Sequence, residues 1–320
     1  MTPLPEVFPG VHRLRAPLPW ELGHINLYLF ALESGWMLVD TGLNTERCFG
    51  AVEASLTAAG IGWRDIRRLL LSHYHPDHVG NACRIVELSD CELLMHRRDY
   101  DQHDAIVSNR NSWMAGLYRA AGVNGGMREA ISDASRGVNR SFQPLRPDRL
   151  LDGGETLEAA LGWLEVVWTP GHSPGHVCLY SHRRKLLFGG DHMLEEITPN
   201  IAWYPEQDML SDFIRSLDLV AALDVDLILP SHGDPYHGHR RRVGEMKRHH
   251  EERCAVVLCG LDAGPKSAHD LVTDVWPRRL APFEYRFAIF ELMAHLEYMR
   301  RQNRVVVDKQ AEPWKWSLPS

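Results

Sequence analysis

The decapeptide LSHYHPDHVG at residues 71–80 constrains this chain more than any other feature of its sequence. An apolar run leads into it, which predicts a buried strand, and Pro76 predicts the first turn of a helix after it. In an extended loop, residues two apart point the same way, so His73 and His75 can converge on one point. Imidazoles and carboxylates together are typical ligands of zinc, iron or manganese. The potential ligands in this motif are His73, His75, Asp77 and His78.

The composition is that of a globular protein, and it narrows the choice of partners. The chain has 320 residues, of which 44% are hydrophobic and 24% are charged, both ordinary values. Its net charge of −7 disfavours non-specific binding to nucleic acid or to an anionic membrane surface. No apolar run approaches the roughly 20 residues that span a bilayer, and no signal peptide is expected. The six scattered cysteines form no C-x-x-C pair, which favours a reduced, cytoplasmic setting.

Further metal-type residues follow other apolar segments that predict strands. These segments alternate with predicted helices, such as one over residues 45–59, and this alternation predicts an α/β protein with sheets covered by helices. We expect the strands to carry the polar side chains to one edge of the sheets. The residues concerned are Asp40, His172, Asp191 and His232.

Two long segments depart from this alternation. Residues 97–147 carry clustered aromatic residues and no strand pattern, which predicts a helical insertion. It forms either a lid or substrate wall, or a surface excursion or dimer contact. The C-terminal part is charged and helical, which predicts a small appendage. The predicted units are a catalytic domain at 1–240, an appendage at 241–310, and a loose tail at 311–320 in which Trp314 and Trp316 could dock.

In their order along the chain, the potential ligands resemble the five motifs of the metallo-β-lactamase superfamily. The resemblance covers roughly residues 7–240 and implies an αββα sandwich with a two-metal site at one edge. The appendage resembles the winged-helix-like unit of a β-lactamase-like group. By the resemblance, Asp40 orients the motif loop or an imidazole and does not bind metal. The implied ligands are His73, His75 and His172 for the first metal, Asp77, His78 and His232 for the second, and Asp191 as the bridge.

The resemblance implies metal-dependent hydrolysis. The implied cofactors are two zinc ions, or iron or manganese. Neutral imidazoles and two carboxylates leave much of the charge of two such ions uncompensated. A bridging water therefore becomes hydroxide near neutral pH. Asp77 and Asp191 are the predicted catalytic carboxylates. The loops TPGHSPGH and GDH, at 169–176 and 190–192, resemble those of glyoxalase II relatives, thioesterases and lactonases. The predicted substrate is therefore a thioester, a lactone or another activated ester.

Three alternatives stay open. A phosphodiesterase or RNA endonuclease would need a basic channel leading to the metals. A mononuclear iron dioxygenase would keep the same histidines. A metal-dependent binding or regulatory module would keep the site without turnover. The predicted partner is a small acyl molecule rather than a membrane or nucleic acid, and a homodimer is left open.

Several other side chains carry weaker predictions. Three lie on or near the loop after Asp191 and could line a substrate pocket or pack structurally: Trp203, Tyr204 and His192. His176 is predicted to pack at the start of a strand. Four histidines have metal-like spacing but lack carboxylate partners, and we expect them at the surface: His237, His239, His249 and His250.

Overall fold

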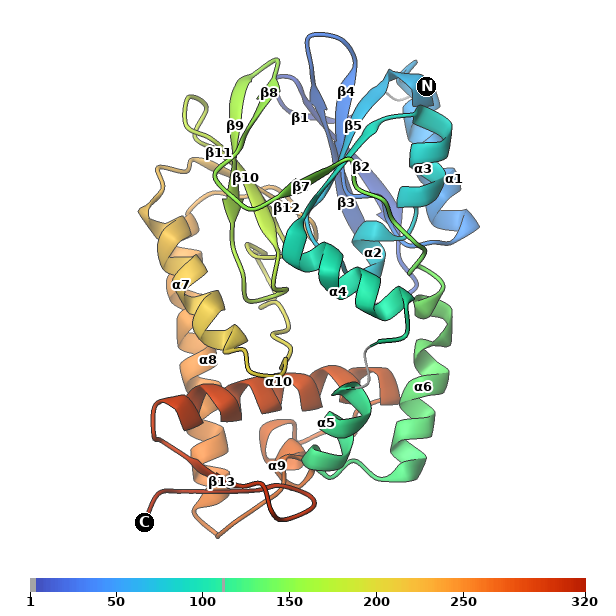
Figure 1. Ribbon diagram of the computed structural model, residues 1–320. Helices are drawn as coiled ribbons and strands as arrows, with labels where there is room; N and C mark the ends of the chain where they lie inside the picture. The colour runs from blue at the N-terminus through green and yellow to red at the C-terminus, as the bar shows by residue number, and fades with distance from the viewer. Residues whose placement is uncertain (1–3, 111–112) are drawn as a thin grey trace.

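The computed structural model describes residues 4–110 and 113–320. Two sheets lie face to face in the upper part of Figure 1 with helices outside them, which is the predicted αββα sandwich. The first sheet has seven strands in chain order, antiparallel from β1 to β4 and parallel from β4 to β7. Its strands are β1 (Glu6–Phe8), β2 (Val11–Pro17), β3 (His24–Ala31), β4 (Trp36–Val39), β5 (Ile66–Leu71), β6 (Glu92–His96) and β7 (Arg149–Leu151).

The second sheet has five strands in the order β12-β11-β10-β9-β8. Its neighbours are antiparallel except β11 and β12. A parallel pair needs a crossover connection, and helix α7 (Met209–Ala222) lies in that connection. The strands are β8 (Thr156–Ala159), β9 (Gly162–Trp168), β10 (Val177–Ser181), β11 (Leu186–Gly190) and β12 (Leu227–Pro230).

Alternate residues of one strand enter different cores, as the two-residue period of a strand requires. In β3, Leu27 and Leu29 belong to the core under the covering helices, whereas Tyr28 and Phe30 belong to the core between the sheets. All four side chains are buried. Burial on both faces explains why this strand reads as a continuous apolar run rather than an alternating one.

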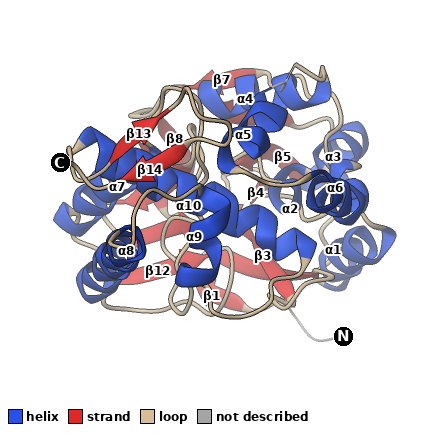
Figure 2. Cartoon of the chain, turned by 90° about the horizontal axis from the view of Figure 1, so that it is seen from below, coloured by secondary structure: helices blue, strands red, loops and turns tan. Residues whose placement is uncertain are grey.

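Helices cover both outer faces of the sandwich. Figure 2 shows α1 and α3 on one flank, α7 and α8 on the other, and strands between them. Thr45 caps α1 by accepting a hydrogen bond from the backbone N–H of Cys48, as expected for a threonine before a helix. The other bounds are α1 (Glu46–Ala58), a 3-10 turn (Trp63–Asp65), α2 (Pro76–Val79), α3 (Ala82–Ser89) and α8 (His239–Leu261).

The predicted insertion is mostly helical in its described residues, and its 113–139 part packs against the C-terminal helices. Leu117 and Ile131 from the insertion share one core with Leu271 and Leu292 from the C-terminal part. In Figure 1 this layer lies below the sandwich, with α10 crossing beneath it. We call it the helical layer: α5 (Trp113–Ala121), α6 (Gly125–Asn139), the 254–261 part of α8, α9 (Ala268–Val275), α10 (Pro282–Arg301) and the β13–β14 hairpin. Helix α4 (Arg97–Val107) lies against β6 instead.

The prediction of a loose C-terminal tail is wrong. Strand β13 (Val306–Asp308) pairs antiparallel with β14 (Lys315–Ser317). Trp316, in β14, has no exposed surface and is among the largest fully buried side chains. A buried indole contributes a large apolar area to a small core, so the docking that we considered for this residue is what holds the end of the chain in place.

Two of the four histidines expected at the surface are buried. His239 and His250 lie on the inner face of α8, which the charged sequence of this helix obscures. His239 Nε2 lies 3.1 Å from the carbonyl oxygen of Leu223, and His250 Nδ1 lies 3.1 Å from His295 Nε2. One ring nitrogen of each histidine therefore finds a partner inside the protein. The surface prediction holds for His237.

Two observations bear on the setting of the protein. Among the described residues, no helix combines the length and the apolar character needed to cross a bilayer. The six cysteines are free thiols, as predicted, and four of them are buried.

Candidate metal centre

Strand β5 delivers the histidine motif to the edge of the first sheet. The strand ends at Leu71, and the chain stays extended up to His75, which is the N-cap of α2 with φ −63° and ψ 151°. Pro76 occupies the first helical turn, where its missing N–H costs nothing. Sequence and backbone therefore agree on how the motif turns from strand to helix.

Seven side chains from four loops gather at this edge. They form three overlapping groups, and within each group the potential ligand atoms lie within 4.8 Å of one another. His75 is half-buried and the other six side chains are buried. The groups are His73 with His75 and His172, His73 with His78 and Asp191, and Asp77 with His78 and His232.

Asp191 lies between two sets of imidazoles. Its Oδ2 is 3.4 Å from His172 Nε2 and 3.6 Å from His78 Nε2, whereas its Oδ1 is 3.5 Å from His232 Nε2. His232 Nε2 is also 3.5 Å from the Oδ2 of Asp77. The two oxygens of one carboxylate thus face different histidines, which is the placement that a bridging ligand needs.

Backbone carbonyls fix the orientation of two of these imidazoles. His172 donates from Nδ1 to the carbonyl oxygen of Asn200 at 2.9 Å, and His232 donates from Nδ1 to that of His24 at 3.1 Å. A proton held on Nδ1 leaves the Nε2 lone pair available at the site. Such outer partners commonly set the tautomer of a metal-binding histidine.

Asp40 orients the motif from outside the ligand groups. Its Oδ2 accepts hydrogen bonds from His78 Nδ1 and from the Ser72 hydroxyl, both at 2.8 Å, and its Oδ1 accepts one from the Ser72 N–H at 2.8 Å. It adopts a φ of 64°, a left-handed conformation that aspartate tolerates better than most residues. Ser72, which the sequence did not single out, therefore helps to connect β4 to the motif.

The donor atoms fit divalent metal ions. His78 Nε2, His172 Nε2 and Asp191 Oδ1 are buried and have no hydrogen-bond partner among the described residues. A buried polar atom without a partner costs free energy, and a cation facing these atoms would remove that cost. Imidazole nitrogens and carboxylate oxygens are the ligands that zinc, iron and manganese share.

The electrostatics separate the histidines into two kinds. Burial and the neighbouring imidazoles hold the pKa of His73 and of His75 well below 6.5, so both are neutral, as metal ligation requires. Burial also opposes protonation of His78, but the carboxylates of Asp40, Asp191 and Asp77 outweigh burial and raise its pKa well above 6.5. A metal held at His78 would therefore have to displace a proton from this imidazole.

His176 supports the backbone of Asp191 and is not a ligand. It is fully buried at the start of β10, where its Nε2 accepts a hydrogen bond from the Asp191 N–H at 3.2 Å. Its Nδ1 then donates to the Thr169 hydroxyl at 2.8 Å. The packing role that we predicted for this residue agrees with these contacts.

Asp99, at the start of α4, joins two of the metal-site loops, and sequence reasoning missed it. Its Oδ2 accepts from the Tyr74 N–H at 2.9 Å and from the Ser173 hydroxyl at 2.6 Å, and its Oδ1 accepts from the Gly175 N–H at 2.5 Å. Burial raises the pKa of this carboxyl to about 6. No local sequence signal marks Asp99, because its partners lie 25 to 76 positions away.

The helical layer reaches the centre through Asn200. The carbonyl of Asn200 holds His172, and its side-chain Nδ2 donates to Glu291 Oε2 at 3.0 Å and to the carbonyl of Phe287 at 3.2 Å. Both partners lie on α10. Arg253, on α8, lies 3.5 Å from the other oxygen of Glu291 and balances its charge. A helix that supplies no ligand thus fixes the loop that orients one.

The three residues predicted to line a substrate pocket lie in different places. His192 is fully buried with its ring centroid 4.9 Å from that of Phe213, which agrees with the packing alternative. Tyr204 is buried as well, and its hydroxyl contacts that of Tyr74. Trp203 lines a hollow in the helical layer.

Similarity to known proteins agrees with this geometry. Residues 20–232 match the family model of the metallo-beta-lactamase superfamily. A probable metallo-hydrolase of Bacillus subtilis, YqjP, is 25% identical over 309 residues, which cover 91% of this chain and 92% of that protein. An acyl-coenzyme A thioesterase of Gallus gallus, MBLAC2, is 36% identical over 93 residues, or 28% of this chain and 32% of its own length.

The similarity to solved structures extends over the whole chain. The crystal structure of a metallo-beta-lactamase family protein from Thermus thermophilus superposes with a TM-score of 0.86 at 32% identity, covering 98% of this chain and all of that one. The helical layer is therefore shared with that protein and is not peculiar to this chain. With two thirds of its sequence in the family model, the chain belongs to the metallo-beta-lactamase superfamily.

Proposed function

We propose that the protein is a dinuclear metal-dependent hydrolase of thioesters, lactones or other activated esters. The observation that carries the proposal is the position of Asp191, whose two oxygens face different sets of histidines. In this assignment the first metal is held by His73, His75 and His172, and the second by Asp77, His78 and His232. Zinc is the metal that we propose, because this ligand set suits it and it supports hydrolysis without redox chemistry.

When bound, the metal pair supplies a water-derived nucleophile near neutral pH and a Lewis acid for the electrophilic oxygen. The chain itself does the positioning. Asp40 keeps the Nδ1 proton of His78 in place, and the Asn200 carbonyl does the same for His172. Because these partners are fixed before the substrate arrives, the site does not reorganise during the reaction.

Three features favour a small acyl substrate over a polyanion. The net charge of −7 gives no general attraction for nucleic acid. A thiolate leaving group needs no strong general acid, so it makes no demand for a further catalytic side chain. The similarity to an acyl-coenzyme A thioesterase points the same way, although it spans only 28% of this chain. A cytoplasmic protein acting on soluble thioesters, with no membrane partner, fits these features.

The test compares turnover on a panel of substrates. Metal-loaded protein is assayed against acyl-CoA, acyl-glutathione, acyl-N-acetylcysteamine, lactones and single-stranded RNA, with elemental analysis of the same sample. We expect about two metal equivalents and thioester or lactone turnover. RNA cleavage with a steep salt dependence and no esterase activity would favour the phosphodiesterase instead. A protein that holds two metal equivalents but turns over none of these substrates would favour the metal-dependent binding or regulatory module.

A further inference from the structure

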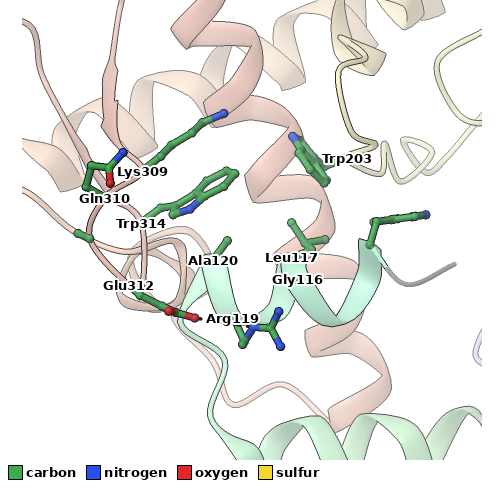
Figure 3. A pocket seen from close by; sticks show the side chains of 11 residues that line it. Gly116, Leu117, Arg119, Ala120, Trp203, Lys309, Gln310, Glu312 and Trp314 are labelled. Atoms are coloured by element: carbon green, nitrogen blue, oxygen red, sulfur yellow. Dashed lines mark ion pairs between the residues drawn. The ribbon is translucent and has the colours of Figure 1, made fainter.

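A separate hollow lies in the helical layer, and none of its lining residues is a candidate metal ligand. Its volume is about 390 Å³. It lies between α5, the loop that precedes α7, and the segment that joins β13 to β14. Three indoles, one from each of these segments, line it: Trp113, Trp203 and Trp314. Figure 3 shows Trp203 and Trp314 with Leu117 and Ala120 of α5 below them.

Two cationic side chains stand at this hollow. Lys309 runs alongside the Trp314 indole in Figure 3, and its Nζ lies 4.6 Å from the ring centroid. Among the described residues it forms no ion pair. Arg119 lies 3.7 Å from Glu312, and both of these side chains are mostly exposed. Two cations against one carboxylate leave a local positive charge on a protein whose net charge is −7.

This lining specifies the chemistry of a ligand. Indole walls bind flat rings by stacking, and they do so for aromatic bases in particular. Lysine and arginine bind phosphate through charge-assisted hydrogen bonds. A plain alkyl chain would use the indoles but would leave the cations and Gln310 without a role. The combination of indole side chains with two cations therefore favours a nucleotide phosphate.

Aromatic contacts connect this hollow to the metal loop. Trp203 lines the hollow, and the next residue, Tyr204, is buried. The rings of Tyr204 and Trp113 lie 5.4 Å apart, and the Tyr204 hydroxyl contacts that of Tyr74. The ring of Tyr74 lies 4.9 Å from that of His75. Two tyrosines thus separate a wall of the hollow from a candidate ligand.

We propose that this hollow binds the adenine nucleotide end of a coenzyme A thioester while the thioester lies at the metal centre. The inference rests on the proposed function and narrows its substrate class to acyl-CoA. It assigns stacking of the adenine to the indoles and contact with phosphate to Lys309 and Arg119. Glu312, which pairs with Arg119, weakens that contact.

The first experiment measures binding of adenosine 3′,5′-bisphosphate, which has the ring and the phosphates but no thiol to reach a metal. Calorimetric titration of the full-length, metal-loaded protein is run with the wild type, Lys309→Met and Glu312→Gln. Methionine keeps the stem on Trp314 and removes the charge. We expect about tenfold weaker binding for Lys309→Met, from the loss of one charge-assisted contact, and tighter binding for Glu312→Gln. Arg183→Met, at an exposed position in the β10–β11 turn, is the control and should bind as the wild type does.

The second experiment compares kcat/KM for one acyl group carried on CoA and on N-acetylcysteamine. Lys309→Met should lower the CoA value about tenfold and leave the N-acetylcysteamine value unchanged, because only CoA carries the phosphates. The bisphosphate should compete with acyl-CoA without changing turnover of the short thioester.

Each contrary result is distinct. No bisphosphate binding, with equal kcat/KM on both carriers, overturns the nucleotide site but leaves the hydrolase proposal standing. If the bisphosphate binds and changes turnover of the short thioester as much as turnover of acyl-CoA, the hollow is an effector site. That result overturns the substrate assignment. Absence of turnover on every thioester overturns the acyl-CoA assignment, and absence of turnover on the lactones and other esters as well removes the proposed function.

Discussion

The sandwich and the helical layer bury different kinds of side chain. At the sandwich edge, imidazoles and carboxylates from four loops are brought within a few ångströms of one another. The core of the helical layer is apolar instead, built from leucine, isoleucine and aromatic residues around Trp316. The described part of the layer contributes no member of the ligand groups. The candidate ligands thus lie on loops at the ends of the double sheet, a common place for functional residues.

The difference shows how a region without ligands can still influence the centre. At the junction, α10 holds Asn200 and Asn200 holds His172. It also carries the indole-lined hollow, close to the tyrosines behind the metal loop. We infer that the sandwich determines the type of reaction, whereas the layer adjusts one ligand and selects the substrate.

The largest effect should come from a ligand in the sandwich. Asp191→Asn keeps the shape of the side chain but removes the charge that serves both sets of histidines. We expect metal content to fall from about two equivalents toward one, and kcat/KM to fall on the order of a thousandfold, beyond the 10–100-fold typical of outer partners. Elemental analysis and kinetics check this. Asp234→Asn, which changes an exposed residue near the site, is the control and should retain both metals. If Asp191→Asn stays fully metallated and active, Asp191 does not bridge the two metals.

Within the helical layer, the largest effect should be on stability. Trp316→Ala empties the centre of the apolar core and should cost about 3–5 kcal/mol in the free energy of unfolding. Chemical denaturation measures the loss. Trp163→Ala is the matched control, because that side chain is 62% exposed and its loss should cost little. A loss below about 1 kcal/mol for Trp316→Ala would mean that the layer does not depend on its C-terminal strand.

The same contrast explains what could be predicted from the sequence. The candidate ligands of the 71–80 motif could be predicted because their spacing is local. Their position after a predicted strand is likewise visible in the chain for His172, Asp191 and His232, and for Asp40 outside the ligand groups. Strand and helix order followed from apolar runs, which the sandwich buries on both faces.

What the sequence did not reveal depends on distant partners. Asn200 carries no signal, because its role comes from bonds to residues 28 and 91 positions away. The charged sequence of α8 hid the burial of His250, which faces His295. Trp316 was placed in a loose tail because pairing of a three-residue strand leaves no periodic pattern. In each case tertiary contact, rather than local preference, decided the outcome.

At the junction, Asn200→Ala tests whether the layer positions His172. The variant keeps the backbone carbonyl but loses both bonds to α10, so the loop should no longer hold the imidazole firmly. We expect affinity for the first metal to fall about 10–100-fold, as for other outer partners, measured by competition with a chelator. Glu291→Gln retains an acceptor for Asn200 Nδ2 and should have a smaller effect. Asn139→Ala, which changes a residue exposed at the end of α6, is the control. Equal metal affinities in the wild type and all three variants would mean that the layer does not position His172.

A smaller effect on stability than that of Trp316→Ala should come from Asp99, which joins α4 to two sandwich loops without touching the layer. In Asp99→Asn, an NH2 group replaces one of the two carboxylate oxygens. This group is itself a donor and cannot accept the hydrogen bonds that Tyr74, Ser173 and Gly175 donate to Asp99. One buried donor then lacks an acceptor, which should cost about 1–3 kcal/mol in the free energy of unfolding. Denaturation of the variant and of Asp101→Asn, an exposed aspartate on the same helix, measures this cost.

The pH dependence of the free energy of unfolding tests whether the Asp99 carboxyl causes this stability difference. Burial raises the pKa of Asp99 from 3.8 to about 6, so the folded protein holds this proton more tightly than the unfolded chain does. That contribution to stability is complete below about pH 3.8 and is lost as the pH rises through about 6. Asparagine does not titrate, so the stability gap between wild type and Asp99→Asn should narrow between pH 4 and pH 6. Metal loss at low pH affects both proteins alike and cancels in the difference. A gap that widens over this range would mean that the three donors, rather than burial, govern the Asp99 carboxyl.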